Sequence, residues 1–228
     1  MSPGAAGPES HPKEASMNTI PDSFCPGCPY RAPLAAMNRL WLRAVSGGGC
    51  SALAAARPFL AVEIAAGHGR AIAALAEAIA SAPGKRRELI ALCGSDELDA
   101  GGLVALATCR GVALAVGDGD IAELCRHSSV ELRECPAFDL GAISAALRSA
   151  LEGEGAAVVF CRGECARTAP RPARAYAIDR DYCRRCGACS RLGCPAISGL
   201  RPPQIDPGLC AGCGVCAQVC KCSAIREA

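Results

Sequence analysis

Short apolar runs alternate with segments of helical apolar spacing in the first two thirds of the chain. The apolar runs lie at 59–65, 88–93, 112–116 and 156–160, and the helical segments lie at 31–43, 70–82, 101–110, 120–127 and 139–152. Strands that alternate with helices form a parallel sheet covered by helices on both faces. The pattern therefore predicts an α/β domain, whose ligands are expected at the carboxyl ends of the strands.

The chain from residue 177 onward has a different pattern, in which one cysteine phrase occurs twice. Ile-Asp precedes each phrase and Ala-Ile follows it, so the repeat includes the flanking chain as well as the thiols. Three cysteines at C-x2-C-x2-C spacing turn their thiolates toward one face of a cubane iron-sulfur cluster, and the fourth ligand comes from elsewhere. A duplicated unit of this kind is typical of a two-cluster ferredoxin domain.

In two-cluster ferredoxins the distant cysteine of each phrase binds the other cluster. The expected ligands are Cys183, Cys186, Cys189 and Cys220 for one [4Fe-4S] cluster, and Cys210, Cys213, Cys216 and Cys194 for the other. Zinc sites usually group cysteines in two pairs, so we predict two clusters in preference to zinc or disulfides. A proline usually follows the fourth cysteine of such a phrase, but Lys221 follows Cys220 here, and this change removes no ligand. Cys222 is either a competing ligand or a packed thiol.

Composition and charge limit the class of protein. The chain has 228 residues, and its 18 cysteines, with no apolar leader sequence before them, favour the reducing cytoplasm. No uncharged apolar run reaches about 18 residues, so no membrane span is expected. A net charge of +2 gives no broad basic field for nucleic acid. The expected organisation is a disordered tail at 1–23, an α/β domain at 24–166, a linker at 167–176 and a ferredoxin domain at 177–228.

Four more cysteines are candidates for a third metal site at the ends of the strands. Cys25 and Cys28 form a C-x2-C pair, Cys50 follows a glycine run, and either Cys165 or Cys161 follows the last strand. Scattered cysteines are also common as buried core thiols. Spacing alone leaves both interpretations open.

These motifs together resemble a known enzyme family. Cys25-Pro-Gly-Cys28-Pro-Tyr-Arg, the glycine run ending in Cys50, Ala66-Gly67-His68-Gly69, the strand that leads to Cys165 and the two-cluster tail are similar to the large subunit of indolepyruvate:ferredoxin oxidoreductase. The resemblance covers residues 24–228 and corresponds to the carboxyl-terminal half of that subunit, a thiamine-diphosphate domain followed by a ferredoxin domain. It implies a third [4Fe-4S] cluster held by Cys25, Cys28, Cys50 and Cys165.

The thiamine part of the resemblance is incomplete. The family holds magnesium diphosphate with a Gly-Asp pair and a downstream asparagine, since a hard cation needs oxygen ligands. Here the pair is Gly94-Ser95, Asp96 is one position out of register, and both asparagines of the chain precede it. Asp118 lies in a Gly-Asp-Gly turn, and its pairing with Asp139 is an alternative metal site. We predict a degenerate thiamine-diphosphate and magnesium site in which Asp96 and Asp118 remain as candidates, and we predict no catalytic residue.

Three functions are compatible with these features. The first is a cytoplasmic iron-sulfur electron carrier that has lost its thiamine site and works with a redox partner protein or oxidoreductase subunit in a hetero-oligomer. The second is the catalytic fragment of a split thiamine-dependent 2-oxoacid:ferredoxin oxidoreductase, whose missing domains another subunit supplies. The third is a module whose clusters report oxygen or iron.

Overall fold

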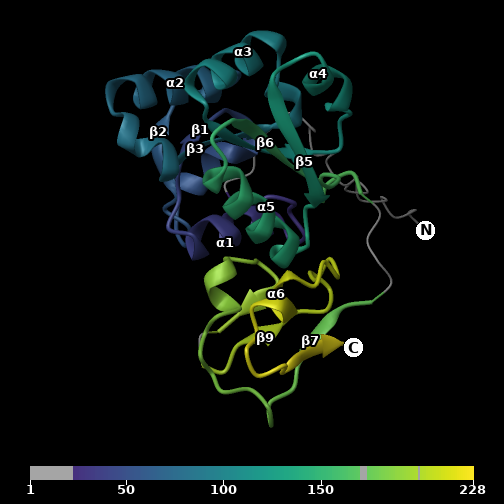
Figure 1. Cartoon of the computed structure of the whole chain (residues 1–228). Helices are drawn as coiled ribbons and strands as arrows, with labels where there is room; N and C mark the ends of the chain where they lie inside the picture. Colours follow the sequence, from purple (N-terminus) through teal and green to yellow (C-terminus); the bar gives the residue numbers. More distant parts are fainter. Residues whose placement is uncertain (1–22, 170–173, 200) are drawn as a thin grey trace, which may run out of the picture.

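The computed structural model describes residues 23–169, 174–199 and 201–228, which form two lobes (Figure 1). We call residues 23–169 the sheet lobe and residues 174–228 the cysteine-repeat lobe. The tail predicted at 1–23 lies almost entirely outside the described residues, as does part of the linker predicted at 167–176. None of the helices in the described part is long and apolar enough to cross a membrane.

The sheet lobe contains one parallel sheet of six strands in the order β2-β1-β3-β4-β6-β5. The strands are β1 (Arg43–Ser46), β2 (Val62–Ala65), β3 (Leu89–Gly94), β4 (Val112–Gly117), β5 (Val130–Pro136) and β6 (Ala156–Arg162). Every neighbouring pair in this sheet is parallel. The predicted α/β class is therefore confirmed.

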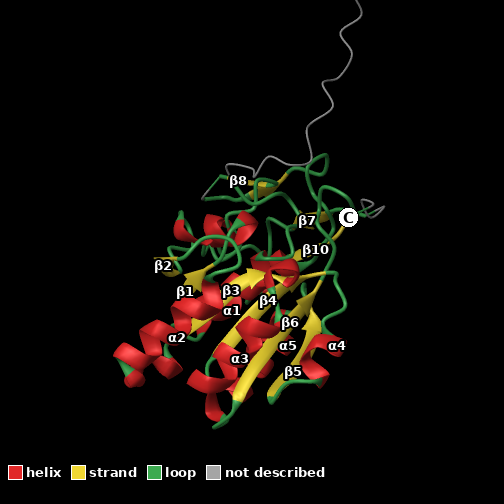
Figure 2. Ribbon diagram, turned by 90° about the horizontal axis from the view of Figure 1, so that it is seen from above, coloured by secondary structure: helices red, strands yellow, loops and turns green. Residues whose placement is uncertain are grey.

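Helices cover both faces of the sheet (Figure 2). They are α1 (Arg31–Arg39), α2 (Ala71–Ser81), α3 (Ala100–Cys109), α4 (Ala122–Arg126) and α5 (Leu140–Glu152). Side chains of α1 and α5 pack in one core cluster with Ile90, Leu114 and Val159, whereas side chains of α2, α3 and α4 pack in a second cluster with their strand neighbours. Successive strand residues alternate between these clusters because strand side chains point to opposite faces.

Strands β1 and β5 lie where the sequence pattern predicts no strand. The helix predicted at 31–43 ends at Arg39, and Trp41 takes a left-handed φ of 57° that turns the chain into β1. Strand β5 carries exposed polar positions because it is an edge strand paired only with β6, so its sequence contains no apolar run. The other predicted elements agree with the structure to within a few residues. Among them, β2 begins at Val62, later than the apolar run predicted at 59–65.

The cysteine-repeat lobe is built from two small antiparallel sheets and one short helix. Strand β7 (Tyr176–Ile178) pairs with β10 (Ile225–Glu227), and β8 (Ile197–Ser198) pairs with β9 (Gln204–Ile205). Helix α6 spans Val215–Gln218. Cys216 lies in α6, and short loops that connect these elements contain the other predicted ligands.

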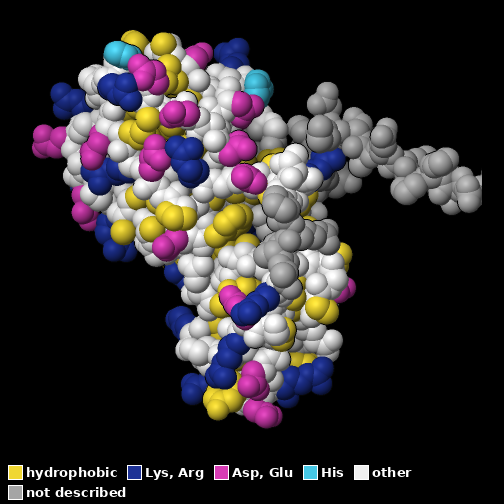
Figure 3. Space-filling model, turned by 90° about the vertical axis from the view of Figure 1, so that its right-hand side faces the viewer, with side chains coloured by type: hydrophobic (Ala, Val, Ile, Leu, Met, Phe, Trp, Pro, Cys, Tyr) yellow, Lys and Arg dark blue, Asp and Glu magenta, His cyan; other side chains and the backbone are white. Residues whose placement is uncertain are grey.

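The two lobes pack through the α1 and α5 side of the sheet, which faces the cysteine-repeat lobe in Figure 1. Leu192 and Val215 belong to the same core cluster as α1 and α5. The Gln218 amide also bridges the lobes, because its oxygen accepts from Leu140 N at 2.9 Å and its nitrogen donates to Phe138 O at 2.7 Å. Apolar packing and directed hydrogen bonds therefore both hold the lobes together. On the face seen in Figure 3, basic and acidic side chains are interspersed over the sheet lobe.

Candidate metal centres

The duplicated sequence repeats its backbone hydrogen bonds as well as its cysteines. Asp179 N donates to Ala224 O at 2.8 Å, and Asp206 N donates to Ala196 O at the same distance. Asp179 Oδ1 accepts from Asp181 N, and Asp206 Oδ1 accepts from Gly208 N. Each aspartate thus fixes the turn that leads into its three closely spaced cysteines.

The pairing of the small strands crosses the two phrases. The strand that opens the first phrase pairs with the strand that closes the second, with Ile178 opposite Ile225. The strand that opens the second phrase pairs with the one that closes the first, with Ile205 opposite Ile197. Because the fourth cysteine precedes each closing strand, the crossing carries it toward the other phrase.

Two cavities in this lobe are each lined by four of the predicted ligands. One is lined by Cys183, Cys186, Cys189 and Cys220, with Cys222 beside them. The other is lined by Cys194, Cys210, Cys213 and Cys216. These groups are the same two sets that the crossed arrangement predicts.

The surroundings of the thiols are largely apolar. The residues lining the second cavity include Leu192, Ile197, Ile205 and Val215, and no carboxylate or histidine is among the described residues that line either cavity. The pKa of Cys216 is raised to about 12, mainly by burial and also by the neighbouring Cys213, Cys210 and Cys194. Each thiolate in such a group raises the pKa of its neighbours. A bound metal cation has the opposite effect, because it lowers the pKa of a coordinating thiol.

Among the described residues, no three His, Cys, Asp or Glu side chains lie close enough together to hold a single metal ion. The four thiolates of a cubane bind four different irons and stand farther apart than the ligands of one ion. All eighteen cysteines are free thiols. The two cavities lined by four thiols are therefore candidate sites for metal clusters.

A third group of thiols lies where the sheet lobe meets the cysteine-repeat lobe. Cys28 N donates to Cys25 O at 3.1 Å, which closes a tight turn between the pair. The pKa of Cys28 is raised to about 12, mainly by burial, with Cys50 and Cys25 as additional causes. Burial also raises the pKa of Cys50, with Cys165 and Cys25 as additional causes. Electrostatic interactions therefore link Cys50 with Cys25, Cys28 and Cys165, the other members of the group that the resemblance implies.

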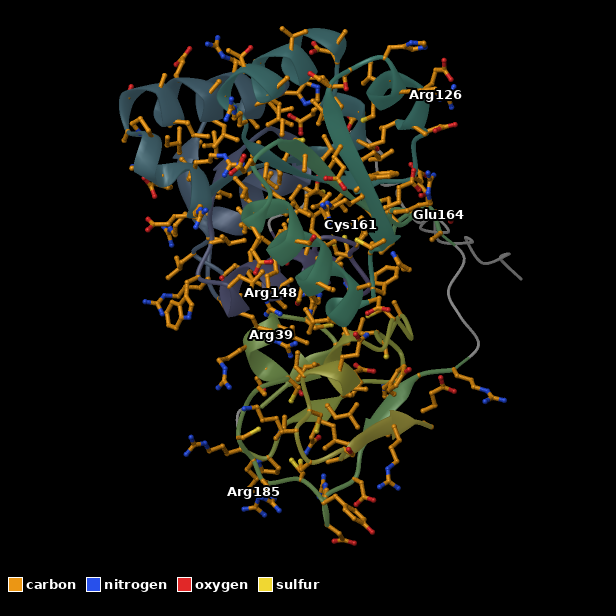
Figure 4. The ribbon with its side chains drawn as sticks, in the orientation of Figure 1. Arg39, Arg126, Arg148, Cys161, Glu164 and Arg185 are labelled. Carbon is orange, nitrogen blue, oxygen red and sulfur yellow. The ribbon has the colours of Figure 1, made fainter. Side chains whose placement is uncertain are left out.

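Cys161 has a different environment from this group. Its Sγ lies 3.7 Å from Cys135 Sγ, within the buried part of the sheet. The hydrogen bond with Cys135 and complete burial both raise the pKa of Cys161. Figure 4 places Cys161 inside the sheet lobe, far from Arg185 in the other lobe. Of the two late cysteines, Cys165 is the one that interacts with Cys50.

Arg31 lies at the junction of the second cavity and the third thiol group. Its side chain is buried, and its guanidinium donates to the carbonyl oxygens of Leu192, Phe24 and Cys25. It lowers the pKa of both Cys28 and Cys213, although burial outweighs this effect. The sequence motifs assign no role to Arg31, and its position shortly after the C-x2-C pair is the available signal.

The loops that carry the thiols touch directly at this junction. Gly27 lies between Cys25 and Cys28 with a φ of +74°, and a Cβ built on it would be 2.5 Å from Ala211 Cβ. Ala211 lies between Cys210 and Cys213. Only glycine allows this approach, since a side chain would clash and would also be strained at that φ.

The residues predicted for the thiamine and magnesium site do not form a cation site. Asp96 and Asp118 are both exposed. The Ser95 hydroxyl occupies the space next to Gly117, where an added Cβ would be 2.1 Å from it. Asp139 caps α5 by accepting from Ala142 N at 2.9 Å, which explains that residue without a metal. None of these three aspartates therefore belongs to a metal-binding group of three or more His, Cys, Asp or Glu side chains in the described part of the chain.

Comparisons with known proteins confirm the resemblance that the motifs indicated. The chain is 28% identical to indolepyruvate oxidoreductase subunit IorA of Pyrococcus horikoshii over 262 aligned positions, covering 91% of this chain and 40% of that protein. It is 45% identical to the ferredoxin-type protein NapF of Escherichia coli over 47 residues, which cover 19% of this chain and 29% of NapF. The chain thus spans about two fifths of the IorA relative that it matches over most of its own length.

Among solved structures, a 2-oxoglutarate:ferredoxin oxidoreductase from Magnetococcus marinus matches with a TM-score of 0.48 and 17% identity, covering 64% of this chain and 65% of that one. The sequence matches no protein-family profile.

Proposed function

We propose that this chain is an iron-sulfur electron-transfer protein related to indolepyruvate oxidoreductase, with one [4Fe-4S] cluster in each of the two cavities of the cysteine-repeat lobe. The observation that carries the proposal is the lining of those cavities. Each is lined by three cysteines of one phrase and the fourth cysteine of the other. When bound, such clusters accept and donate single electrons.

The backbone around the thiols suits this role. Tyr176 N donates to Cys210 Sγ at 3.4 Å, and hydrogen bonds of this kind stabilise negative charge on ligand sulfur. Apolar lining residues keep water away from the sulfur atoms, and exclusion of water tunes the reduction potential. The similarity of part of the chain to a ferredoxin-type protein also supports the proposal.

A third cluster, held by Cys25, Cys28, Cys50 and Cys165, extends the same proposal. The electrostatic interactions among these thiols support it. The contact between Gly27 and Ala211 places the loop of this group against the loop of the second cavity. Electrons would then pass from the third cluster in the sheet lobe to the cluster at Cys210–Cys216 and on to the cluster at Cys183–Cys189. A redox partner or oxidoreductase subunit would bind at either end of this path.

The crossing of the ligands is testable in a background that lacks one cluster. We expect a Cys183→Ser, Cys186→Ser, Cys189→Ser variant, purified without oxygen, to retain about eight irons per chain, or two clusters. Adding Cys194→Ala should lower the count to about four, whereas adding Cys220→Ala should change nothing. Loss of iron on adding Cys220→Ala, with none on adding Cys194→Ala, would show that each cluster is bound by the fourth cysteine of its own phrase.

We propose further that the thiamine-diphosphate site has been lost. The exposed Asp96 and Asp118 and the packing of Ser95 against Gly117 support this. A second candidate is a catalytic fragment of a split oxidoreductase, which the similarity to an oxidoreductase subunit over 91% of this chain favours. A rise in melting temperature on adding thiamine diphosphate and magnesium, with the remaining subunit present, would support the second candidate against the first.

A further inference from the structure

The buried carboxylate of Glu97 accepts hydrogen bonds from three glycine amides. Its Oε2 accepts from Gly48 N at 3.0 Å and from Gly69 N at 2.8 Å, and its Oε1 accepts from Gly94 N at 2.9 Å. Its side chain is only 3% exposed. Among the described residues, the ionisable side chain within ion-pair distance is His68, whose exposed Nδ1 lies 3.7 Å from Oε2. Backbone donors therefore provide most of the polar surroundings of this anion.

The three amides belong to turns at the carboxyl ends of adjacent strands. Gly48 follows β1, Gly69 follows β2, and Gly94 ends β3. β1 lies between β2 and β3, so the chain reverses its direction of winding at β1. In open parallel sheets, ligands bind in the crevice outside the strand ends at such a switch point. Here the side chain of Glu97 fills that position.

The glycine turns fit the carboxylate closely. A Cβ on Gly47 would be 2.3 Å from Glu97 Oε2, and a Cβ on Gly48 would be 2.6 Å from His68 Cβ. An alanine at either position would therefore displace a neighbour. Backbone amides that point into a concavity bind anions in many proteins, and here three separate turns provide them.

There is also space beside the carboxylate for the rest of a larger ligand. A cavity lined by Gly69, Ile72, Cys93 and Glu97 opens next to it. Asp99 also lines this cavity, but its Oδ1 accepts from Gly102 N at 2.6 Å as the cap of α3. The donors and the adjoining space are those required by a phosphate or diphosphate group, whose oxygens accept from the same kind of amides.

We propose that the turns at Gly48, Gly69 and Gly94 form an oxyanion-binding site, and that Glu97 occupies it as an internal substitute for a phosphate group. The carboxylate keeps phosphate and diphosphate ligands out of the crevice while satisfying the three amides. None of the proposed cluster ligands takes part, so this inference and the electron-transfer proposal stand or fall separately.

Removal of the carboxylate tests the proposal. The Glu97→Ala variant, titrated calorimetrically with inorganic pyrophosphate at constant ionic strength, should bind at least about tenfold more tightly than the wild-type chain, which is the effect of one hydrogen bond to a charged group. Pyrophosphate should raise its melting temperature and leave that of the wild type unchanged. The matched control is Glu123→Ala, which removes an exposed carboxylate and should not create binding.

A folded Glu97→Ala chain that binds pyrophosphate no better than the wild type overturns the proposal. If the variant folds only with pyrophosphate present, that rescue supports the site, because the anion then replaces the lost acceptor. Failure of pyrophosphate to rescue folding counts against it. The Glu97→Gln variant keeps the size of the side chain but removes its charge and one acceptor, and it should be less stable than the wild type and regain stability with pyrophosphate. Iron content measured on the same samples tests the electron-transfer proposal independently.

Discussion

The guanidinium of Arg31, at the start of α1, donates a hydrogen bond to the carbonyl oxygen of Leu192, 161 positions away in the sequence. The same guanidinium binds the carbonyls of Phe24 and Cys25. One buried cation thus joins the turn of the Cys25–Cys28 pair to the segment between Cys189 and Cys194. It also lies between two groups of thiols, one from each lobe.

We expect Arg31→Met to lower the reduction potential of the proposed clusters next to it. A nearby positive charge stabilises the reduced, more negative state, and its loss should lower the potential by roughly 60 mV, the one-electron equivalent of about 1.4 kcal/mol. Potentiometric titration followed by electron paramagnetic resonance measures the shift. The control is Arg39→Met, on the same helix but exposed, which should leave the potentials unchanged. Equal potentials in both variants would contradict the role of Arg31.

Cys165→Ala should remove about four irons per chain, whereas Cys161→Ala should remove none. The reason is that Cys165 interacts with Cys50, while Cys161 contacts Cys135 inside the sheet. Iron analysis of the two purified variants checks this directly. Loss of iron from the Cys161 variant alone would identify that residue as the late ligand.

Gly27→Ala should weaken the packing of the two lobes. The new Cβ would meet Ala211 Cβ at 2.5 Å and would be strained at a φ of +74°, so we expect a loss of about 1–3 kcal/mol in the free energy of unfolding. Denaturant titration measures it. Gly84→Ala is the matched control, since no atom lies within 4 Å of the position its Cβ would take and its φ is not left-handed. Equal stability of the two variants would mean that the contact is unimportant.

The free energy of unfolding should fall as pH rises above about 9, in part because of Cys93. Burial raises the pKa of this thiol above its ordinary value of 9.0, and Glu97 and Asp96 raise it further. The folded chain keeps the proton while the unfolded chain loses it, so stability is complete below pH 9 and decreases above it, by up to about 1.4 kcal/mol per pH unit. Cys93→Ala should make the decline between pH 9 and 10.5 less steep. An unchanged slope would exclude this contribution.

The sequence was sufficient to predict the α/β class. The two sets of four cysteines predicted from the repeat each line one cavity of the cysteine-repeat lobe. The spacing groups Cys183–Cys189 and Cys210–Cys216, and the pattern of two-cluster ferredoxins predicts the fourth cysteine of each set. The sequence leaves the choice between Cys161 and Cys165 open, because the two cysteines are close together in the chain. In the structure Cys161 lies within β6, whereas Cys165 follows that strand.

Strands β1 and β5 were missed for physical reasons. Four residues of β1 follow a helix with no break in apolar spacing, and β5 alternates charged and apolar residues at the edge of the sheet. Glu97 and Arg31 could not be assigned from sequence either. Their roles depend on backbone amides and carbonyls from distant turns, which leave no mark on residue types.

Metal and acid-labile sulfide analysis of the chain, purified under strictly anaerobic conditions, tests the central claim most directly. Three thiol quartets predict about twelve irons and about twelve sulfides per chain, or about eight of each if the group at the junction binds no cluster. A preparation that contains zinc without sulfide, or about four irons in total, would contradict the assignment of both cavities as cluster sites.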